Sequence, residues 1–229
     1  MDHPRFEDFF PPWKELADEH RQQLKEAAVL IGVPKKRILH NGNADCIGVL
    51  LIFEGQLRAY MTSAEGKEVS LFRLFKRDMC LLSASCMLAD IQFEITVEAE
   101  KDTVLWLIPA EIYRSVMKMS VGLANYTNSL MASHFTEVMW LMEQIIFKSM
   151  DERLAAFLLN ESDLENTDNL HITHEQIARH LGSAREVITR LLQYLQNEGA
   201  VELNRGCIRI TNKNLLENRF KEKKPPQIK

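Results

Sequence analysis

The sequence at Ile172–Leu192 reads I-T-H-E-Q-I-A-R-H-L-G-S-A-R-E-V-I-T-R-L-L, and it carries the most informative pattern of the chain. It contains two predicted helix starts, each with the spacing of a capping box. The pairs are Thr173 with Gln176 and Ser183 with Glu186. Gly182 lies between them and predicts the end of the first helix and a turn. Two short helices joined by a glycine turn predict a helix-turn-helix.

Apolar residues give each of these helices an inner face. They are Ile177, Ala178 and Leu181 in the first helix, and Val187, Leu191 and Leu192, with Ile188 at the edge, in the second. The second helix then presents Arg185, Glu186, Thr189 and Arg190 outward. Such a helix fits the major groove of DNA, where arginine pairs with guanine and glutamate accepts from cytosine. A solvated face would also be charged, so an inert helical pair is the alternative.

The segment that follows predicts a β-hairpin, which makes the module winged. Val201–Leu203 and Cys207–Ile210 flank the turn residues Asn204-Arg205-Gly206. Residues 168–229 carry 11 basic and 7 acidic side chains, a net charge of +4, whereas residues 1–167 carry 17 and 25, a net charge of −8. A basic segment on an acidic body indicates contact with a polyanion. A solvated lysine-rich terminus is the alternative, because four of the eleven basic residues are lysines beyond position 220.

The N-terminal half changes its hydrophobic period along the chain. Residues 13–31 predict a helix, with apolar residues at three- and four-residue spacing, ended by Gly32 and Pro34. Short β-branched and apolar runs then alternate with turn residues up to Ile108. The predicted strands are Ile47–Phe53, Leu57–Thr62, Glu68–Leu74, Phe93–Glu98 and Val104–Ile108. This spacing predicts an antiparallel sandwich or barrel.

Helical periodicity returns after Pro109. A short helix is expected at Ala110–Met117 and a long one from about Val121 to Lys148, roughly 28 residues or about 42 Å. The long helix carries a coiled-coil seam, which predicts a dimer interface at Asn128, Met131, Phe135, Val138, Met142 and Ile145. A second apolar face would pack on the β domain; the alternative is a central helix buried inside one monomer. Asp151–Asn160 predicts a short helix, and the polar stretch 161–170 a loop.

The chain resembles the CRP/FNR family of transcription regulators over nearly its whole length. The strongest block is Ile172–Leu192, with Gly199-Ala200 before the wing. Weaker marks lie at Asn41-Gly42, Gly55, Gly66 and Val97-Glu98-Ala99. The resemblance implies an α+β fold in three parts: an N-terminal double-stranded β-roll (jelly-roll-like) in residues 1–120, a dimerisation helix in 121–148, and a winged helix-turn-helix domain in 149–229.

The resemblance also implies a function, that of a homodimeric, sequence-specific regulator of transcription. In the family, the positions matching Arg185, Glu186 and Arg190 read bases, and the position of Thr189 is often a serine that supports base reading. The expected DNA contacts are Ser183, Arg185, Glu186, Thr189, Arg190, Thr173, His180 and Arg205. The expected partners are a second copy of the chain, a palindromic double-stranded DNA operator with half-sites about 34–36 Å apart, and RNA polymerase.

The effector of such a regulator is less well defined by the sequence. The family's cyclic AMP readers carry a Gly-Glu pair and an Arg-Ser or Arg-Thr pair between two β-roll strands. Here Lys76–Leu88 has no Gly-Glu, and Phe93-Glu94 stands where Arg-Ser would be. A carboxylate there would repel a phosphate, so cyclic AMP is not expected. An iron–sulfur cluster is not expected either, because no cysteine precedes Cys46.

A chemically open pocket is what remains of the effector site. Its expected lining is Cys80, Ser83, Ser85, Cys86, Tyr126 and Met131. Thiolate, thioether or imidazole ligands would suit a haem or thiol-redox sensor, with His134 as a further ligand. The alternative is that both cysteines are small buried hydrophobes. A contact of His174 or His180 with phosphate is favoured over zinc, and no metal is expected.

Composition excludes several other classes of protein. The chain has 229 residues, 46% of them hydrophobic and 26% charged, with no apolar run long enough to span a membrane and no secretory signal. Four cysteines are too few for a disulfide framework, so the cytoplasm is the expected compartment. No catalytic signature is present, and an enzyme is not expected. The alternative function is a cyclic-nucleotide-binding signalling module whose helix-turn-helix contacts proteins.

Overall fold

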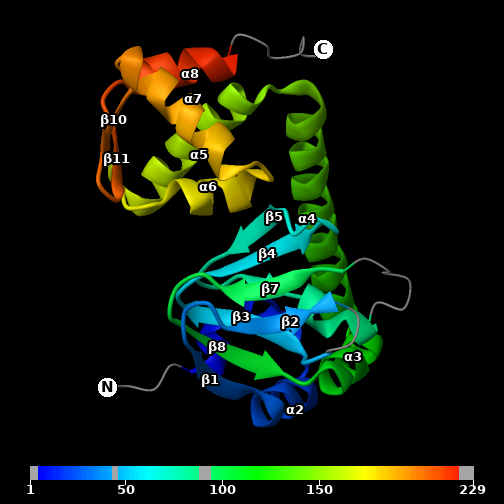
Figure 1. The fold of residues 1–229 in the computed structure, drawn as a ribbon. Coiled ribbons are helices and arrows are strands. Elements are labelled where there is room, and N and C mark those ends of the chain that lie inside the picture. The colour runs from blue at the N-terminus through cyan, green and yellow to red at the C-terminus, as the bar shows by residue number, and fades with distance from the viewer. Residues whose placement is uncertain (1–4, 43–45, 88–93, 222–229) are drawn as a thin grey trace. The chain divides into compact units, whose positions relative to one another are not determined.

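The chain forms two compact units in the computed structural model, which describes residues 5–42, 46–87 and 94–221 (Figure 1). The first unit is Met1–Thr62 with Ser70–Met139, and the second is Ser63–Val69 with Trp140–Lys229. The boundary between Met139 and Trp140 falls inside one long helix. The division into a β-roll, a dimerisation helix and a winged helix therefore stays an interpretation of the sequence.

Two four-stranded antiparallel sheets form the body of the first unit. One has the order β1 (Val29–Val33), β8 (Thr103–Ile108), β3 (Val49–Glu54) and β6 (Met79–Cys80). The other has the order β2 (Ile38–Asn41), β7 (Thr96–Ala99), β4 (Leu57–Thr62) and β5 (Glu68–Leu74). The predicted antiparallel β domain is confirmed, and the bounds predicted for β4 and β5 match those observed.

Strand β3 is buried on both faces, which explains its continuous apolar run. Leu50 and Ile52 belong to the core that also contains Leu57 of the second sheet. Val49 and Leu51 belong to a different core, which is built with the helices of this unit. Because side chains alternate along a strand, a V-L-L-I run is the pattern of a strand covered on both sides.

The predicted helix over residues 13–31 is confirmed at Asp18–Ala27 and is wrong at both ends. The chain forms α1 (Phe6–Phe9), the 3-10 helix η1 (Pro11–Glu15) and α2 (Asp18–Ala27), and then continues as strand β1. Strand β1 pairs with β8, where Leu30 lies opposite Trp106. The apolar residues after Ala27 therefore satisfy their backbone groups in a sheet, with a partner that lies more than 70 residues away.

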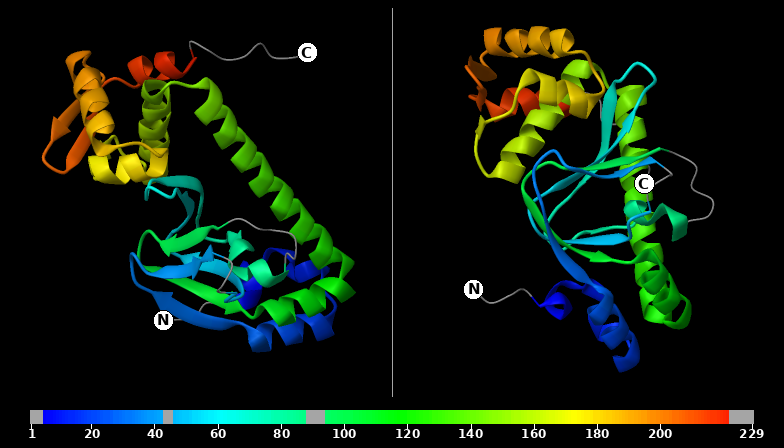
Figure 2. Two further views of the ribbon diagram at one scale, coloured as in Figure 1. Left: turned by 45° about the vertical axis from the view of Figure 1, so that its right-hand side comes forward. Right: turned by 60° about the horizontal axis from the view of Figure 1, so that its bottom comes forward.

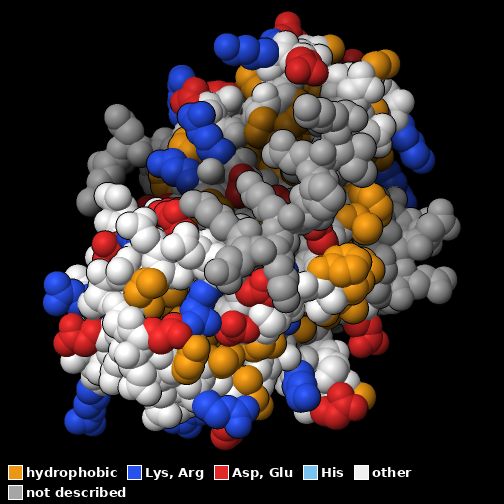
Figure 3. Space-filling view, turned by 90° about the horizontal axis from the view of Figure 1, so that it is seen from above, with side chains coloured by type: hydrophobic (Ala, Val, Ile, Leu, Met, Phe, Trp, Pro, Cys, Tyr) orange, Lys and Arg blue, Asp and Glu red, His pale blue; other side chains and the backbone are white. Residues whose placement is uncertain are grey.

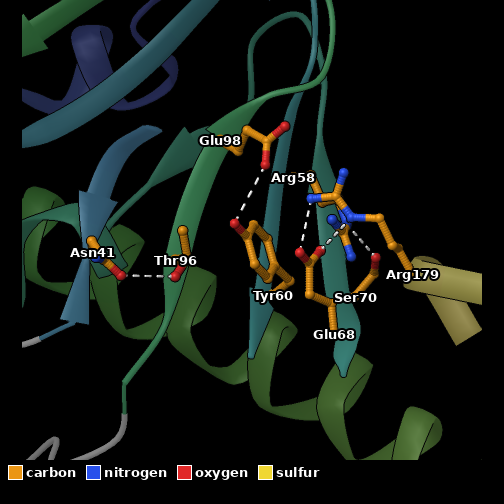
Figure 4. A network of polar contacts seen from close by, with 8 residues as sticks. All are labelled: Asn41, Arg58, Tyr60, Glu68, Ser70, Thr96, Glu98 and Arg179. Carbon is orange, nitrogen blue, oxygen red and sulfur yellow. Dashed lines mark hydrogen bonds and ion pairs between the residues drawn. The ribbon is translucent and has the colours of Figure 1, made fainter. Parts of the chain in front are cut away.

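Polar side chains join neighbouring strands of the second sheet (Figure 4). Each bond links two strands that also pair through their backbones. The bonded pairs are Thr96 with Asn41 at 3.2 Å, Tyr60 with Glu98 at 3.3 Å and Arg58 with Ser70 at 2.6 Å. The guanidinium of Arg58, a buried residue, also lies 4.3 Å from the ring centre of Tyr60.

A short helix, α3 (Ala110–Met119), leads into the unbroken 27-residue helix α4 (Val121–Phe147), close to the predicted bounds (Figure 2). Two residues of the predicted dimer seam face inward: Met131 and Val138 pack against cores of the first unit. The exposed stripe of α4 is shifted by about one residue at these positions. It consists of Asn128, Ala132, Phe135, Met139, Met142 and Ile146, and Ile145 of the predicted seam is exposed beside it.

The second unit packs its helices and a small sheet around one apolar core. The helices are α5 (Met150–Glu165), α6 (His174–Leu181), α7 (Arg185–Asn197) and α8 (Lys213–Lys221). The strands are β9 (Asn169–Leu170), β10 (Val201–Asn204) and β11 (Cys207–Ile210), and β11 lies between the other two. The β10–β11 hairpin is the predicted wing (Figure 1).

The predicted loop over residues 161–170 is wrong in its first half, because α5 continues through Glu165. Glu161 and Ser162 are buried although they are polar, and the Ser162 hydroxyl donates to Asp168 at 2.6 Å. Asn166, in the left-handed conformation, then caps the helix. Helix α8 was not predicted, and it contributes Leu216 to the core. Across the ranges that the structure describes, no helix has the length and apolar character needed to cross a bilayer.

Candidate nucleic-acid interface

The first helix of the motif, α6, begins with the predicted capping box. The Thr173 hydroxyl accepts from the Gln176 backbone N–H at 3.2 Å, and the Thr173 backbone N–H donates to the Gln176 side chain at 2.9 Å. Two backbone N–H groups that the helix itself leaves unpaired are thereby satisfied. This cap fixes where α6 begins.

Removing this cap gives a first testable prediction. Thr173→Ala is expected to lower the free energy of unfolding of the second unit by about 1 kcal/mol, because the backbone N–H of Gln176 loses its acceptor. Urea unfolding of the full chain, followed by hydrogen exchange of the α6 amides, measures the effect. Thr136→Ala is the control, since it removes an exposed hydroxyl from α4. Equal exchange rates in Thr173→Ala and wild type would contradict the prediction.

The turn between the two helices differs from its prediction. Gly182 adopts φ 67° and its N–H bonds to the Ala178 carbonyl, which also accepts from the Ser183 N–H at 3.0 Å. The second capping box, Ser183 with Glu186, is wrong. The N-cap is Ala184, whose carbonyl accepts the first helical bonds of α7. The left-handed turn at Gly182 uses two further residues before helical geometry begins, so α7 starts at Arg185.

The later start sets which face of α7 is buried. Ile188, Leu192 and Leu195 are fully buried, whereas Val187 and Leu191 are half-buried. Ile188 is therefore at the centre of the inner face and not at its edge. The opposite face exposes Arg185, Glu186 and Arg190, as predicted, within the first two turns of the helix, whereas Thr189, also predicted to face outward, is half-buried.

The exposed arginines of α7 are available for a ligand. Among the residues that the structure describes, neither Arg185 nor Arg190 has an ion-pair partner. Arg205 is exposed at the turn of the wing, where Gly206 has φ 75°. Over the face seen in Figure 3, basic side chains are interspersed with acidic ones. The exposed guanidinium groups of Arg185, Arg190 and Arg205 therefore define the candidate interface.

Thr189 is joined to α6 through His174. The Thr189 hydroxyl lies 2.9 Å from His174 Nδ1 and donates to the Arg185 carbonyl, also at 2.9 Å. Burial, with a smaller contribution from the Arg185 charge, lowers the pKa of His174, so the imidazole is neutral at pH 7. Sequence reasoning missed this pairing, because the two residues lie on different helices and 15 positions apart.

One predicted DNA contact is wrong. His180 is buried, and its ring packs on Phe157 with the ring centres 5.3 Å apart. A side chain in this position cannot reach a phosphate without leaving the core. Its place in the last turn of α6 puts it on the same inward-facing side as Ile177.

The predicted effector residues Cys80 and Ser83 are both fully buried. Cys80 lies in the core between the sheets, and burial raises the pKa of its thiol. The Ser83 hydroxyl donates to the Gly48 carbonyl at 2.7 Å, which ties the 3-10 helix η3 (Leu82–Met87) to the start of β3. The geometry of Cys80 fits a small buried hydrophobe. The side chains of Ser85 and Cys86 lie outside the described residues. Phe93, which with Glu94 stands at the position of the family's Arg-Ser pair, lies outside them as well.

The remaining effector candidates lie along α4. Tyr126 and Met131 pack against the core that contains Val49 and Leu51. Burial raises the pKa of Tyr126 to about 12. His134 is stacked on Phe72 with the ring centres 4.3 Å apart, and its Nδ1 lies 3.1 Å from Glu137. In the described part of the chain, no three His, Cys, Asp or Glu side chains gather into a metal site.

The cysteines differ in state, which gives a second testable prediction. Cys46 is disulfide-bonded, whereas Cys80 and Cys207 are free thiols, buried and half-buried respectively. Only the thiolate reacts, and burial both raises the pKa of the Cys80 thiol and shields it from the reagent. Cys80→Ala is therefore expected to leave the number of thiols titrated in the native protein unchanged. The count should fall by one in denaturant. Cys207→Ala is the comparison, and a lower native count in Cys80→Ala would contradict the burial of Cys80.

Comparison with known proteins places this geometry in context. A family model for the Crp-like helix-turn-helix domain matches residues 152–219. A protein of Eubacterium rectale ATCC 33656, named as a transcriptional regulator of the crp/fnr family, is 54% identical, with a TM-score of 0.91 over 94% of this chain and 100% of that one. The cyclic AMP receptor protein of Thermus thermophilus is 25% identical over 167 residues, 73% of this chain and 76% of the relative. FixK2 of Bradyrhizobium japonicum, 18% identical over 83% of this chain and 96% of that one, shares the fold with a TM-score of 0.68.

Proposed function

Because the chain belongs to the CRP/FNR family of transcription regulators and carries their helix-turn-helix DNA-binding domain, we propose that it acts as a homodimer on a palindromic operator. Each subunit lays α7 into one major groove, with Arg185, Glu186 and Arg190 at the base edges. One observation carries this proposal: these side chains are exposed in the first turns of α7, and neither arginine is held by an internal ion pair within the described part of the chain.

The exposed stripe of α4 supports the homodimer. Phe135 is 67% exposed, Met142 46% and Ile146 62%, at the 3- and 4-residue spacing of a two-stranded coiled coil. A monomer would leave this apolar row in water along several turns of helix. A second copy of α4 would bury it, and the dimer would then carry two α7 helices, one for each half-site of a palindrome.

A signal sensed in the first unit would act on this dimer, with RNA polymerase as the downstream partner. Cyclic AMP is not the expected signal, because Phe93-Glu94 stands where the family's cyclic AMP readers carry Arg-Ser, and a carboxylate there would repel a phosphate. The signal would shift the population between two dimer geometries, only one of which fits adjacent major grooves. The runner-up function is a cyclic-nucleotide-binding signalling module. It draws on the name of the Thermus thermophilus relative, a cyclic AMP receptor protein.

Selection of duplexes from a random pool by the purified full-length protein tests the proposal. We expect enrichment of an inverted repeat, which then gives a mobility shift that an unrelated duplex does not. Titration with cyclic AMP and cyclic GMP, followed by calorimetry, tests the runner-up in the same preparation. Absence of any enriched duplex, together with micromolar binding of a cyclic nucleotide, would overturn the proposal in favour of the signalling module.

A further inference from the structure

The segment Ser63–Val69, called the tip below, includes the turn between strands β4 and β5 and belongs to the second unit. The carboxylate of Glu68 in the tip lies against Arg179 of α6 (Figure 4). Arg179 Nε donates to one carboxylate oxygen at 3.0 Å, and Nη2 donates to the other at 2.8 Å. A bidentate pair of this kind is directional, and the edge of the guanidinium that it uses is closed to any other anion.

The tip also contacts the turn between α6 and α7. Val69 forms an antiparallel backbone bridge with Leu181. A Cβ atom placed on Gly182 would lie 2.4 Å from a methyl carbon of Val69, so the tip packs directly on the turn. Ser183, the next residue, is an expected DNA contact, and α7 begins at Arg185. The tip therefore contacts the motif at the end where α7 would enter the major groove.

The charges at this end of α6 suit an anion. The Arg153 guanidinium donates to the Leu181 carbonyl at 2.7 Å, so a second cation lies at the same helix end as Arg179. In the part of the chain that the structure describes, Arg153 forms no ion pair. A guanidinium that holds a carboxylate bidentately holds a phosphate in the same way. The first helix of a helix-turn-helix crosses the sugar–phosphate backbone, and here that helix is α6.

We propose that Arg179 is a phosphate-binding residue of the DNA interface, and that the tip covers it in the free protein through Glu68. The inference rests on the proposed function, since it adds a backbone contact to the bases that α7 reads. DNA binding then exchanges one bidentate partner for another: the carboxylate of Glu68 leaves Arg179, and a phosphate takes its place. The tip is in this way an autoinhibitory contact, which lowers the DNA affinity by the strength of the ion pair that must be broken.

The sign of the effect of Glu68→Gln tests this competition. The probe is a duplex selected by the full-length wild-type protein from a random pool. Glu68→Gln should bind it about fivefold more tightly, because one partly exposed ion pair no longer has to be broken in each subunit. A folding defect would weaken binding and cannot imitate this gain. Glu65→Gln is the matched control, because it removes the same charge from an exposed position of the same tip, and it should bind as wild type does.

Variants of Arg179 test the phosphate contact. Arg179→Gln should weaken binding and reduce the slope of log K against log salt by about 1.8, because each subunit of the dimer loses one phosphate contact. Base preference should not change, since phosphate contacts carry no sequence information. In the Arg179→Gln background, Glu68→Gln should have no further effect, because the cation that it covers is gone. A merely structural ion pair would instead make both single variants bind more weakly, with an unchanged salt slope.

The outcomes separate this inference from the function on which it rests. If the wild-type protein enriches no duplex, the proposed function fails and the inference falls with it. If a duplex is selected but Glu68→Gln binds it no more tightly than wild type, the tip does not compete with DNA, and the inference is overturned while the function stands. An unchanged salt slope in Arg179→Gln, or a relaxed preference at one base pair, overturns the assignment of Arg179 to phosphate.

Discussion

Replacing Phe135 with glutamate is expected to convert the dimer to a monomer and to weaken operator binding at least about 100-fold, the usual size of the loss when bivalent binding becomes monovalent. Phe135 is 67% exposed in the middle of the apolar stripe of α4. In a symmetric dimer the new carboxylate would face its own copy across an apolar seam, and two like charges without partners disfavour burial there.

Sedimentation velocity measures this effect, and circular dichroism checks that the variant is folded. Ser129→Glu is the matched control, because Ser129 is exposed on the same helix but outside the stripe. It should sediment as wild type does. A Phe135→Glu variant that remains dimeric at micromolar concentration would show that the exposed face of α4 is not the interface.

Replacing Arg185 or Arg190 with alanine is expected to cost about 1–3 kcal/mol for each bidentate arginine–base interaction that is removed. A dimer carries each substitution twice, so the operator affinity should fall by about twice that free energy. Both side chains are exposed, and alanine suits a helix, so stability should be unaffected.

The loss should depend on sequence, which distinguishes base reading from general attraction to phosphate. Each variant should tolerate substitution of one operator base pair that wild type rejects, measured by mobility shift at fixed salt. Lys213→Ala is the control: it removes a positive charge from the same unit, but one that lies 2.7 Å from Asp168 in an ion pair. Wild-type affinity and base preference in both arginine variants would contradict the assignment of α7.

The sequence predicted those parts of the fold that local patterns determine. The bounds of β4 and β5 and the Thr173 capping box follow from alternation, turn residues and side-chain spacing. Strand β1 could not be predicted in this way, because its pairing with β8 joins distant segments and its apolar residues also fit the end of a helix. The predicted seam of α4 differs from the exposed stripe at two positions for a similar reason, since only packing shows that Met131 and Val138 face the cores of their own unit.

In the candidate site, too, the features set by local sequence patterns could be predicted and those that depend on packing could not. The exposed charges of α7 could be predicted, because they lie opposite an apolar face on one helix. The inward turn of His180 and the bond between His174 and Thr189 could not, since both depend on how two helices pack. The effector residues were the least predictable, because a free cysteine suits a sensor and a core equally, and only burial distinguishes them.

The central claim is that two subunits joined along α4 read two half-sites. Native mass spectrometry of the wild-type protein on its selected duplex, and on a duplex with one half-site scrambled, tests it most directly. The account predicts two chains on the intact duplex and a loss of affinity of at least about 100-fold when one half-site is scrambled. A complex of one chain with one duplex, equally stable on both, would contradict it.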